Sequence, residues 1–549
     1  MSLKNWFIVA TSVALSACTP RQWPATDPAP EPAPTPETPA PTPSAREAPD
    51  SWHLLDPATD GYVGISLLKA ERELLAGKSP ARTVVVAVID NGVDTTHSKL
   101  RPQLWTNADE VGGNGRDDDN NGYADDLRGW NLIGGSDGRN VHHDTYEVTR
   151  LAAQCARPAG RDSLRPDLRE RCAEIQSHFE RKSAEAREIL QNVTQIDAVM
   201  RQVVPYLKRV MGTDTLTAEK VEAFTPPNDT ARQARGVYLQ IASMGIDEQE
   251  LADAKEAYES QVRYGYNLEF DPRAIVGDNY PDTSVKRYGN PNVTGPEPLH
   301  GTHVAGIIAA LDSAGVRGIA RNVKIMALRA VPDGDERDKD IANAIRYAVD
   351  NGAHIINMSF GKAYSPYKRY VDDAVKYADS KGVLMVHAAG NESANVDSTS
   401  SFPTPAYYGG SGRARNWIEV GATSWHGKDS LVATFSNWGK GVVDIFAPGD
   451  DIKSTAPGGT YKKESGTSMA SPVVAGVAAL VMSYYPTLTA ADVKQIVLES
   501  AHRMADVKVI RPGEGSEAPV PFSDLSATGG IVNAYNALKR AEEISRVRP

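Results

Sequence analysis

Runs of consecutive hydrophobic residues recur along the chain and predict buried strands. Residues 83–89 read TVVVAVI, a continuous run rich in β-branched residues. Such a run is typical of a strand covered on both faces, as in a parallel sheet. Similar runs predict further strands at 323–331, 354–360, 383–389, 417–423 and 442–447.

The segments between these strands carry hydrophobic residues at helical spacing. One predicted helix face collects Ile341, Ala344, Ile345, Ala348 and Val349, and another collects Val371, Ala374, Val375 and Ala378. Strands and helices that alternate in this way imply right-handed crossovers. We therefore predict an α/β fold, a doubly wound and mostly parallel sheet with helices on both faces. Ligands of such sheets bind beyond the carboxyl ends of the strands.

Residues 140–285 lack this alternation of strands and helices and predict an α-helical insertion. Apolar residues recur there at steps of three and four, namely Ile189, Val193, Ile196, Met200, Val203 and Leu207. A second helix is predicted over 247–264, with Asp247 as its N-cap. The apolar stripe favours a core inside the insertion. The alternative is a groove that binds an unknown partner.

The first residues indicate export. Residues 1–18 carry Lys4 and then an apolar run too short to span a bilayer, as in a secretory signal. The run ends in Leu15-Ser16-Ala17-Cys18, which resembles the bacterial lipobox, in which the cysteine is lipidated. Thr19 follows, and the resemblance then favours the outer membrane, facing the periplasm or the surface. The alternative is an ordinary signal peptide in which the cysteine has no role.

A Pro-rich stretch follows the signal and predicts a semi-rigid tether over 19–50. Ordered structure is expected from 51 to 545, interrupted by the insertion. The net charge of −11 argues against a general nucleic-acid binder. Cys155 and Cys172 are the cysteines left after Cys18. In an exported protein they could form a disulfide or remain two free thiols.

Four polar residues fall where strands end or helices begin. Asp90 ends the strand in VAVIDNGVD, and Asn391 follows another strand in HAAGN. His300 opens the small-residue helix of HGTHVAG, and Ser468 opens that of GTSMASP. A serine at a helix start is by itself most often an N-cap. The four together lie at one predicted sheet edge, so an N-cap role alone no longer accounts for Ser468.

These motifs and their order resemble the subtilisin family of serine proteases. The resemblance covers about 80–150 and 285–540, and NMSFG at 357–361 is similar to the substrate-binding strand of that family. It implies that Ser468 is the nucleophile, His300 the general base and Asp90 the residue that orients the base. It also implies that Asn391 stabilises the oxyanion. We expect His303, one turn after His300, to be a buried structural histidine.

The resemblance also implies a substrate cleft for proteins or peptides. Its walls would be Ser359, Phe360 and Gly361 on one side and Ala388, Ala389 and Gly390 on the other. The small residues predict broad specificity with some preference for an apolar side chain before the scissile bond. No cofactor is expected for catalysis.

An acidic loop, DDDNNGYADD at 117–126, has the spacing of a calcium loop. Its candidate ligands are Asp117, Asp119, Asn121, the Tyr123 carbonyl and Asp125. The twelfth position is Arg128 rather than Glu, so the loop is not an EF-hand. A structural Ca²⁺ is one expectation, and a solvated acidic loop is the alternative. Lys99 stands where the family often has an aspartate ligand of another calcium site, which puts that site in doubt.

The function expected is that of a lipid-anchored serine endopeptidase acting through an acyl-enzyme. The alternative is a catalytically silent binding or scaffolding lipoprotein on the same fold. None of the four candidate catalytic residues is replaced, which favours the enzyme.

Overall fold

The computed structural model describes residues 48–398, 413–513 and 518–547, and these divide into two compact units. One unit is Arg171–Leu268, and the other comprises Glu47–Glu170 and Glu269–Pro549. The signal segment, its Cys18 and nearly all of the tether lie outside the described residues. Each unit is described by itself.

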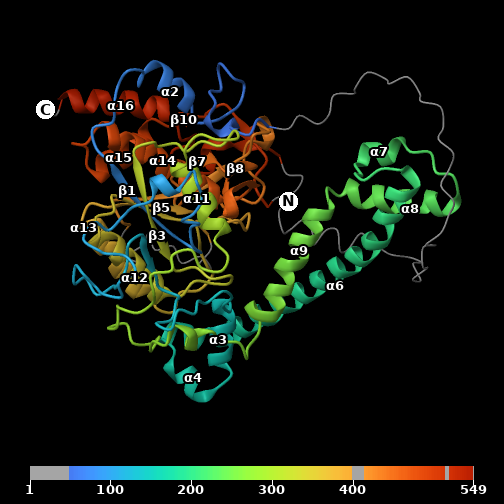
Figure 1. Cartoon of the computed structure of the whole chain (residues 1–549), viewed down its shortest axis with the longest axis horizontal. Helices are drawn as coiled ribbons and strands as arrows, with labels where there is room; N and C mark the ends of the chain where they lie inside the picture. Colours follow the sequence, from blue (N-terminus) through green and yellow to red (C-terminus); the bar gives the residue numbers. More distant parts are fainter. Residues whose placement is uncertain (1–47, 399–412, 514–517, 548–549) are drawn as a thin grey trace. The chain divides into compact units, whose positions relative to one another are not determined.

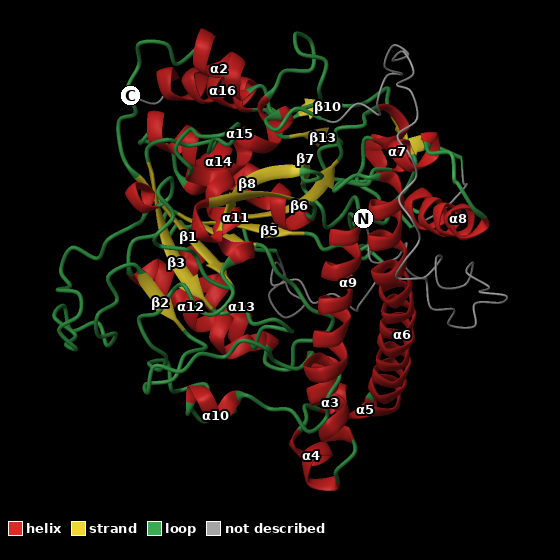
Figure 2. Ribbon diagram, turned by 45° about the vertical axis from the view of Figure 1, so that its right-hand side comes forward, coloured by secondary structure: helices red, strands yellow, loops and turns green. Residues whose placement is uncertain are grey.

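The larger unit is built on a nine-stranded sheet (Figure 1, Figure 2). Its strand order is β10-β13-β7-β6-β5-β4-β1-β3-β2, and every pairing is parallel except that of β10 with β13. The strands are β1 Val84–Asp90, β2 Gly129–Asn131, β3 Val323–Arg329, β4 Ile355–Met358, β5 Leu384–Ala388, β6 Trp417–Thr423, β7 Ile445–Pro448, β10 His502–Arg503 and β13 Gly530–Ile531. Two small antiparallel pairs are β8 Ile452–Ala456 with β9 Thr460–Glu464, and β11 Lys508–Val509 with β12 Val520–Pro521.

Helices cover both faces of this sheet (Figure 1). Its α-helices are α2 Leu67–Glu73, α3 Glu147–Cys155, α4 Pro158–Ser163, α5 Pro166–Glu170, α10 Arg273–Val276, α11 Leu299–Ala309, α12 Asp338–Asp350, α13 Lys368–Ser380, α14 Thr467–Tyr484, α15 Ala490–Glu499 and α16 Ala534–Val547. Short 3-10 turns are η1 Trp52–Leu54, η2 Arg101–Gln103, η4 Lys428–Ser430, η5 Pro457–Gly459 and η6 Phe522–Asp524. The predicted α/β class is confirmed.

The continuous hydrophobic runs form strands because side chains pointing to either face are buried. On β1, Val86 and Val88 pack in one cluster with α11 and α14, whereas Ala87 and Ile89 pack in another with α12 and α13. Helix α14 is long and apolar enough to cross a membrane by composition, but 89% of it is buried in the unit. It is therefore a core helix of this unit.

The beginning and the end of the larger unit lie against each other. Trp52 is fully buried and donates its Nε1–H to the carbonyl of Asp450 (3.2 Å). Asn533 donates its side-chain N–H to the hydroxyl of Ser66 (2.9 Å), and Ala534 donates its backbone N–H to the carbonyl of Ile65 (2.8 Å). Because of these contacts, the C-terminal α16 packs beside α2.

The smaller unit is helical and has a core of its own. Its helices are α6 Cys172–Met211, α7 Ala218–Ala223, α8 Asp229–Ser243, α9 Glu248–Ser260 and the π-helical turn η3 Gln261–Gly265. Helix α9 begins with a capping box between Asp247 and Glu250, so Asp247 is the N-cap that the sequence predicts. The apolar stripe of α6 packs against α8 and α9 with Val193, Val203 and Leu207 fully buried. The stripe is therefore core.

Candidate active site

Four of the predicted residues are presented at the carboxyl edge of the parallel sheet. Asp90 ends β1, and Asn391 follows β5. His300 and Ser468 are each the second residue of a helix, α11 and α14. These two helices pack against each other on one sheet face. Because β1, β4 and β5 are neighbours and parallel, their carboxyl ends bring this set together.

Asp90 and His300 form a direct hydrogen bond between the Asp90 Oδ1 and the His300 Nδ1 atoms, 2.7 Å long. The Asp90 side chain is 2% exposed, whereas that of His300 is 37% exposed and can meet a substrate. The backbone N–H of Asn91 also donates to Oδ1 of Asp90 (2.8 Å). Oδ2 of Asp90 is buried and has no hydrogen-bond donor among the described residues.

Two opposing effects act on the pKa of His300. Burial disfavours the charged imidazolium and lowers the pKa, whereas the Asp90 carboxylate, through its charge and its hydrogen bond, raises it. The charge of Glu464 raises the pKa of His300 by a smaller amount. The pKa ends above the ordinary value of a histidine. Asp90 therefore stabilises the protonated state that a general base reaches after accepting a proton.

Ser468 is held at the first turn of α14 by the segment after β4. Its hydroxyl donates to the carbonyl of Ser359 (3.1 Å), and the Ser359 hydroxyl donates in return to the carbonyl of Ser468 (2.9 Å). Asn357 donates to the Ser359 hydroxyl from β4 (3.0 Å). In the described structure the serine hydroxyl is thus engaged by Ser359, and among the described residues no hydrogen bond joins it to His300.

Two N–H donors flank one small space beside Ser468. A Cβ atom placed on Gly466 would lie 3.5 Å from the backbone nitrogen of Ser468 and 3.6 Å from Nδ2 of Asn391. Oδ1 of Asn391 accepts hydrogen bonds from the backbone N–H (2.9 Å) and the hydroxyl (3.0 Å) of Thr467. These bonds fix the orientation of the amide, and among the described residues no acceptor binds its NH₂ group.

A cavity of about 240 Å³ opens beside these donors. Phe360 and Gly361 line one part of it, and Ala388, Ala389 and Gly390 line another. These are residues of both predicted cleft walls. Ser359 takes part through its bonds to Ser468. The cavity extends to charged residues that sequence reasoning missed, namely Glu336, Asp338, Lys362, Lys368, His387, Glu392 and Glu419.

His303 is fully buried, so the prediction that it is structural is confirmed. Its Nε2 lies 3.0 Å from the carbonyls of Ile452 and Lys462 in the β8–β9 hairpin. Burial lowers the pKa of His303 to about 3. It therefore holds α11 on the hairpin as a neutral donor.

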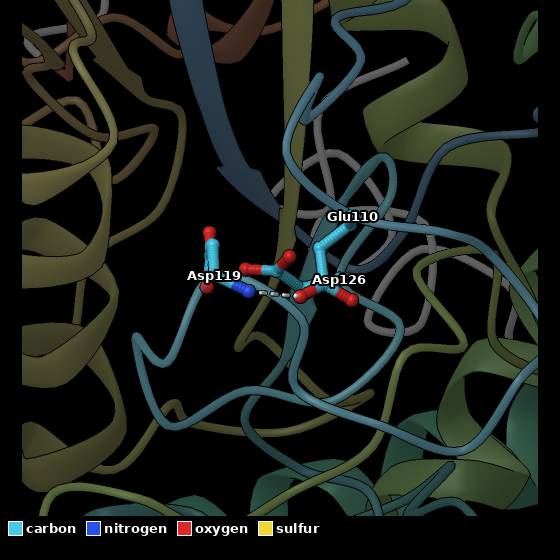
Figure 3. A group of neighbouring side chains, drawn as sticks. All are labelled: Glu110, Asp119 and Asp126. Carbon is cyan, nitrogen blue, oxygen red and sulfur yellow. Dashed lines mark hydrogen bonds between the residues drawn. The ribbon is translucent and has the colours of Figure 1, made fainter.

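The acidic loop gathers a carboxylate group that differs from the predicted one. Oxygen atoms of Glu110, Asp119 and Asp126 lie within 4.8 Å of one another (Figure 3). The dashed line in Figure 3 joins the Asp119 backbone N–H to Glu110 (3.3 Å). Asp126 is fully buried, and the hydroxyl of Tyr347 donates to it (2.5 Å).

The other predicted loop ligands have partners within the protein. Asp117 accepts from the backbone N–H groups of Asn121 and Gly122, and Asp125 accepts from those of Gly113, Asn114 and Gly115. The Asn121 amide donates to Asp119 and Asp126, and the ring of Tyr123 packs edge-on against Trp130 and Tyr347. Glu110 lies upstream of the predicted motif, and nothing in the ten-residue spacing indicates it.

Cys155 and Cys172 are both disulfide-bonded. Neither is a free thiol in the structure, which contradicts the alternative that both cysteines remain free.

A parallel α/β sheet with an Asp–His pair, a serine at a helix start and two amide donors defines the class of serine-nucleophile hydrolases. Comparison with known proteins places the chain within that class. The subtilase family model matches residues 81–519, and the chain belongs to the subtilase family.

Curated relatives are similar to part of the chain. The chain is 38% identical over 268 residues to the thermophilic serine proteinase of Bacillus sp. (strain AK1), covering 47% of this chain and 60% of the relative. It is 40% identical over 228 residues to subtilisin E of Bacillus subtilis (strain 168), covering 40% of this chain and 56% of the relative. The chain thus matches just over half the length of these two relatives.

Among solved structures, the chain is similar to a cold-adapted subtilisin-like serine proteinase. The two are 32% identical with a TM-score of 0.34, covering 44% of this chain and 77% of that one.

Proposed function

We propose that the protein is a serine endopeptidase that hydrolyses peptide bonds of proteins through an acyl-enzyme. The observation that carries the proposal is the 2.7 Å bond between Asp90 and His300, at the edge where Ser468 begins α14. A weakly acidic hydroxyl becomes a nucleophile only beside such a base.

In this mechanism the Ser468 hydroxyl rotates toward His300, transfers its proton to Nε2 and attacks the substrate carbonyl carbon. The carbonyl π-electrons move to oxygen, and the Ser468 and Asn391 N–H groups stabilise that oxyanion. The imidazolium then protonates the leaving amine as the C–N bond breaks. Water attacks the acyl-enzyme by the same route and releases the acid and the free serine.

Labelling with a fluorophosphonate tests the proposal, because the reagent bonds covalently to an activated serine. We expect the purified protein to be labelled and a Ser468→Ala variant to remain unlabelled. Ser471→Ala is the matched control, since Ser471 lies on the same helix and its hydroxyl is buried against Asn357 (2.9 Å). A folded protein that does not react would favour the scaffolding alternative.

We also propose lipid anchoring through Cys18, on the sequence alone. Cys18→Ala is expected to abolish incorporation of labelled fatty acid and to move the protein out of the outer-membrane fraction. Cells that retain the variant in that fraction would contradict the anchor.

We further propose that the acidic loop binds a structural Ca²⁺. The carboxylates of Glu110, Asp119 and Asp126 fit one oxygen-preferring cation, since their oxygens lie within 4.8 Å. We expect EDTA to lower the Tm and Ca²⁺ to restore it. Glu110→Gln should abolish that calcium dependence, whereas Asp117→Asn should keep it, because Asp117 is not one of the three clustered carboxylates. An unchanged Tm in EDTA would overturn the proposal.

A further inference from the structure

The lining of the cavity beside Ser468 includes ionisable groups. Thr467, Ser468 and Asn391 line it together with Glu336 and His387. At about 240 Å³, it accommodates one long side chain rather than a drug-sized molecule.

His387 and Glu419, two ionisable residues that line the cavity, form an ion pair. Nδ1 of His387 lies 2.8 Å from Oε1 of Glu419, and both side chains are less than 10% exposed. Oε2 of Glu419 accepts the indole N–H of Trp417 (2.7 Å). Burial lowers the pKa of His387, but Glu419 raises it above the ordinary value. Neither group therefore leaves an unmet charge in the cavity.

Lys362 is also fully engaged. Its ammonium donates to Glu147 (2.8 Å) and to the backbone carbonyl of Glu336 (2.8 Å), and it forms an ion pair with Asp338 (2.8 Å). An ammonium has three N–H donors, and these three acceptors use all of them. Lys362 therefore compensates Glu147 and Asp338 and has no donor left for the Glu336 carboxylate.

Glu336 differs from its neighbours. It is 5% exposed, and among the described residues its own backbone N–H is the hydrogen-bond donor to its carboxylate, with none from another residue. A buried carboxylate with a single donor is costly, so such a group is expected to find a further partner that the free protein does not supply. Burial accordingly raises the pKa of Glu336, to about 8, against the attraction of Lys362.

We propose that Glu336 recognises a cationic side chain, lysine or arginine, of the peptide substrate on the amino side of the scissile bond. The inference rests on the proposed endopeptidase function and names the substrate class for that site. This preference for a cationic side chain replaces the apolar preference expected from the small wall residues, because the Glu336 carboxylate lines the same cavity. The substrate cation supplies the N–H donors that the carboxylate lacks.

Paired fluorogenic peptides test this on the full-length protein. One series places arginine, and the other its uncharged isostere citrulline, at each of the four positions before the scissile bond. We expect kcat/KM to favour arginine at least about tenfold at the position whose side chain enters the cavity. In Glu336→Gln that ratio should fall close to one, and Glu336→Asp should keep part of it.

Glu543→Gln is the matched control, since Glu543 is 62% exposed on α16, outside the cavity. It should retain the wild-type ratio. Fluorophosphonate labelling of each variant shows that it is folded with a competent Ser468. Equal kcat/KM for citrulline and arginine peptides at every position would overturn the inference and leave the proposed function standing. An unchanged arginine-to-citrulline ratio in labelled Glu336→Gln would do the same. A protein that neither reacts nor cleaves any peptide would remove both.

Discussion

At the residue scale, the Asp90–His300 bond raises the pKa of His300, the proposed general base. The pKa of His300 lies above that of an ordinary histidine because Asp90 favours the imidazolium more than burial disfavours it. A general base must be neutral to accept a proton. Activity is therefore low below this raised pKa and increases as the pH rises through it.

We expect kcat/KM for uncharged peptides to rise with pH, with a midpoint above 6.5. Asp90→Asn removes the attraction, so the midpoint should move downward. It should also lower kcat by about 10⁴-fold, the size of effect that loss of this group has in a subtilisin. Rates measured from pH 5 to 9 check both points. If the midpoint of the pH profile did not move in Asp90→Asn, the result would contradict this explanation of the raised pKa of His300.

Glu336 predicts a second pH effect, on selectivity rather than on rate. With a pKa of about 8, its carboxyl is mostly neutral at pH 7 and gains charge as the pH rises. The arginine-to-citrulline ratio should therefore increase between pH 7 and 9. The charged groups around it are Asp335, Asp338, Lys362, Lys368, His387, Glu392 and Glu419. A ratio that falls over this range would contradict the assignment of the effect to Glu336.

At the element scale, α11 depends on close approach to the β8–β9 hairpin. A Cβ atom on Gly306 would lie 2.1 Å from Oγ1 of Thr455 and 2.3 Å from Oγ of Ser454. Both hydroxyls donate to carbonyls of α11, those of Thr302 and His303 (2.8 and 2.7 Å). The position of His300 therefore depends on a glycine about one and two-thirds turns away.

Gly306→Ala should lower the free energy of unfolding by about 1–3 kcal/mol through overpacking and should also slow fluorophosphonate labelling. Gly236→Ala is the matched control, because Gly236 is an exposed glycine in α8 with no atom near its added Cβ. It should leave the Tm unchanged or raise it, since alanine favours a helix. Thermal melts compare the two variants. Equal losses in both would show that helix propensity, rather than the hairpin contact, sets the cost.

The hydrophobic pattern located the large elements well and the small ones poorly. The run at 83–89 became Val84–Asp90, and that at 417–423 became Trp417–Thr423 without change. Strands Ile452–Ala456 and Thr460–Glu464 were missed because the second is polar and no residue in it is buried. Their pairing depends on α11, which lies about 150 residues earlier, as in the contact of His303 with Ile452.

The candidate site could be predicted only in part, for a similar reason. Asp90, His300, Asn391 and Ser468 lie in local motifs, so the sequence indicates them. Glu336 lies in a polar run before α12, where an exposed acid is the ordinary expectation. Its burial depends on segments such as that of Lys362, whose own partner Glu147 is 215 residues away.

At the scale of the whole molecule, the chain contains two units with separate cores. In Arg171–Leu268, Val193, Val203 and Leu207 pack with α8 and α9 to form a core without residues of the other unit. This separation predicts independent stability.

A fragment comprising 171–268, with Cys172→Ser, should therefore be helical by circular dichroism and should unfold cooperatively on heating. Val203→Asp should abolish that cooperative transition, because it buries an unpaired charge. Arg201→Asp, on the exposed side of α6, is the control and should leave it in place. Gradual melting of the unchanged fragment would contradict independence.

The contacts between the start and the end of the larger unit affect when the fold can be completed during synthesis. They join Asn533 and Ala534 to Ser66 and Ile65. Strand β13 pairs with β7, and α16 packs beside α2, so the sheet is completed by residues that are synthesised after Ser468. Ser468 itself emerges 378 residues after Asp90. A nascent chain that ends before Ser468 therefore lacks both the proposed nucleophile and β13. We expect Ser468 to become reactive only after β13 and α16 have been synthesised and have packed into the larger unit.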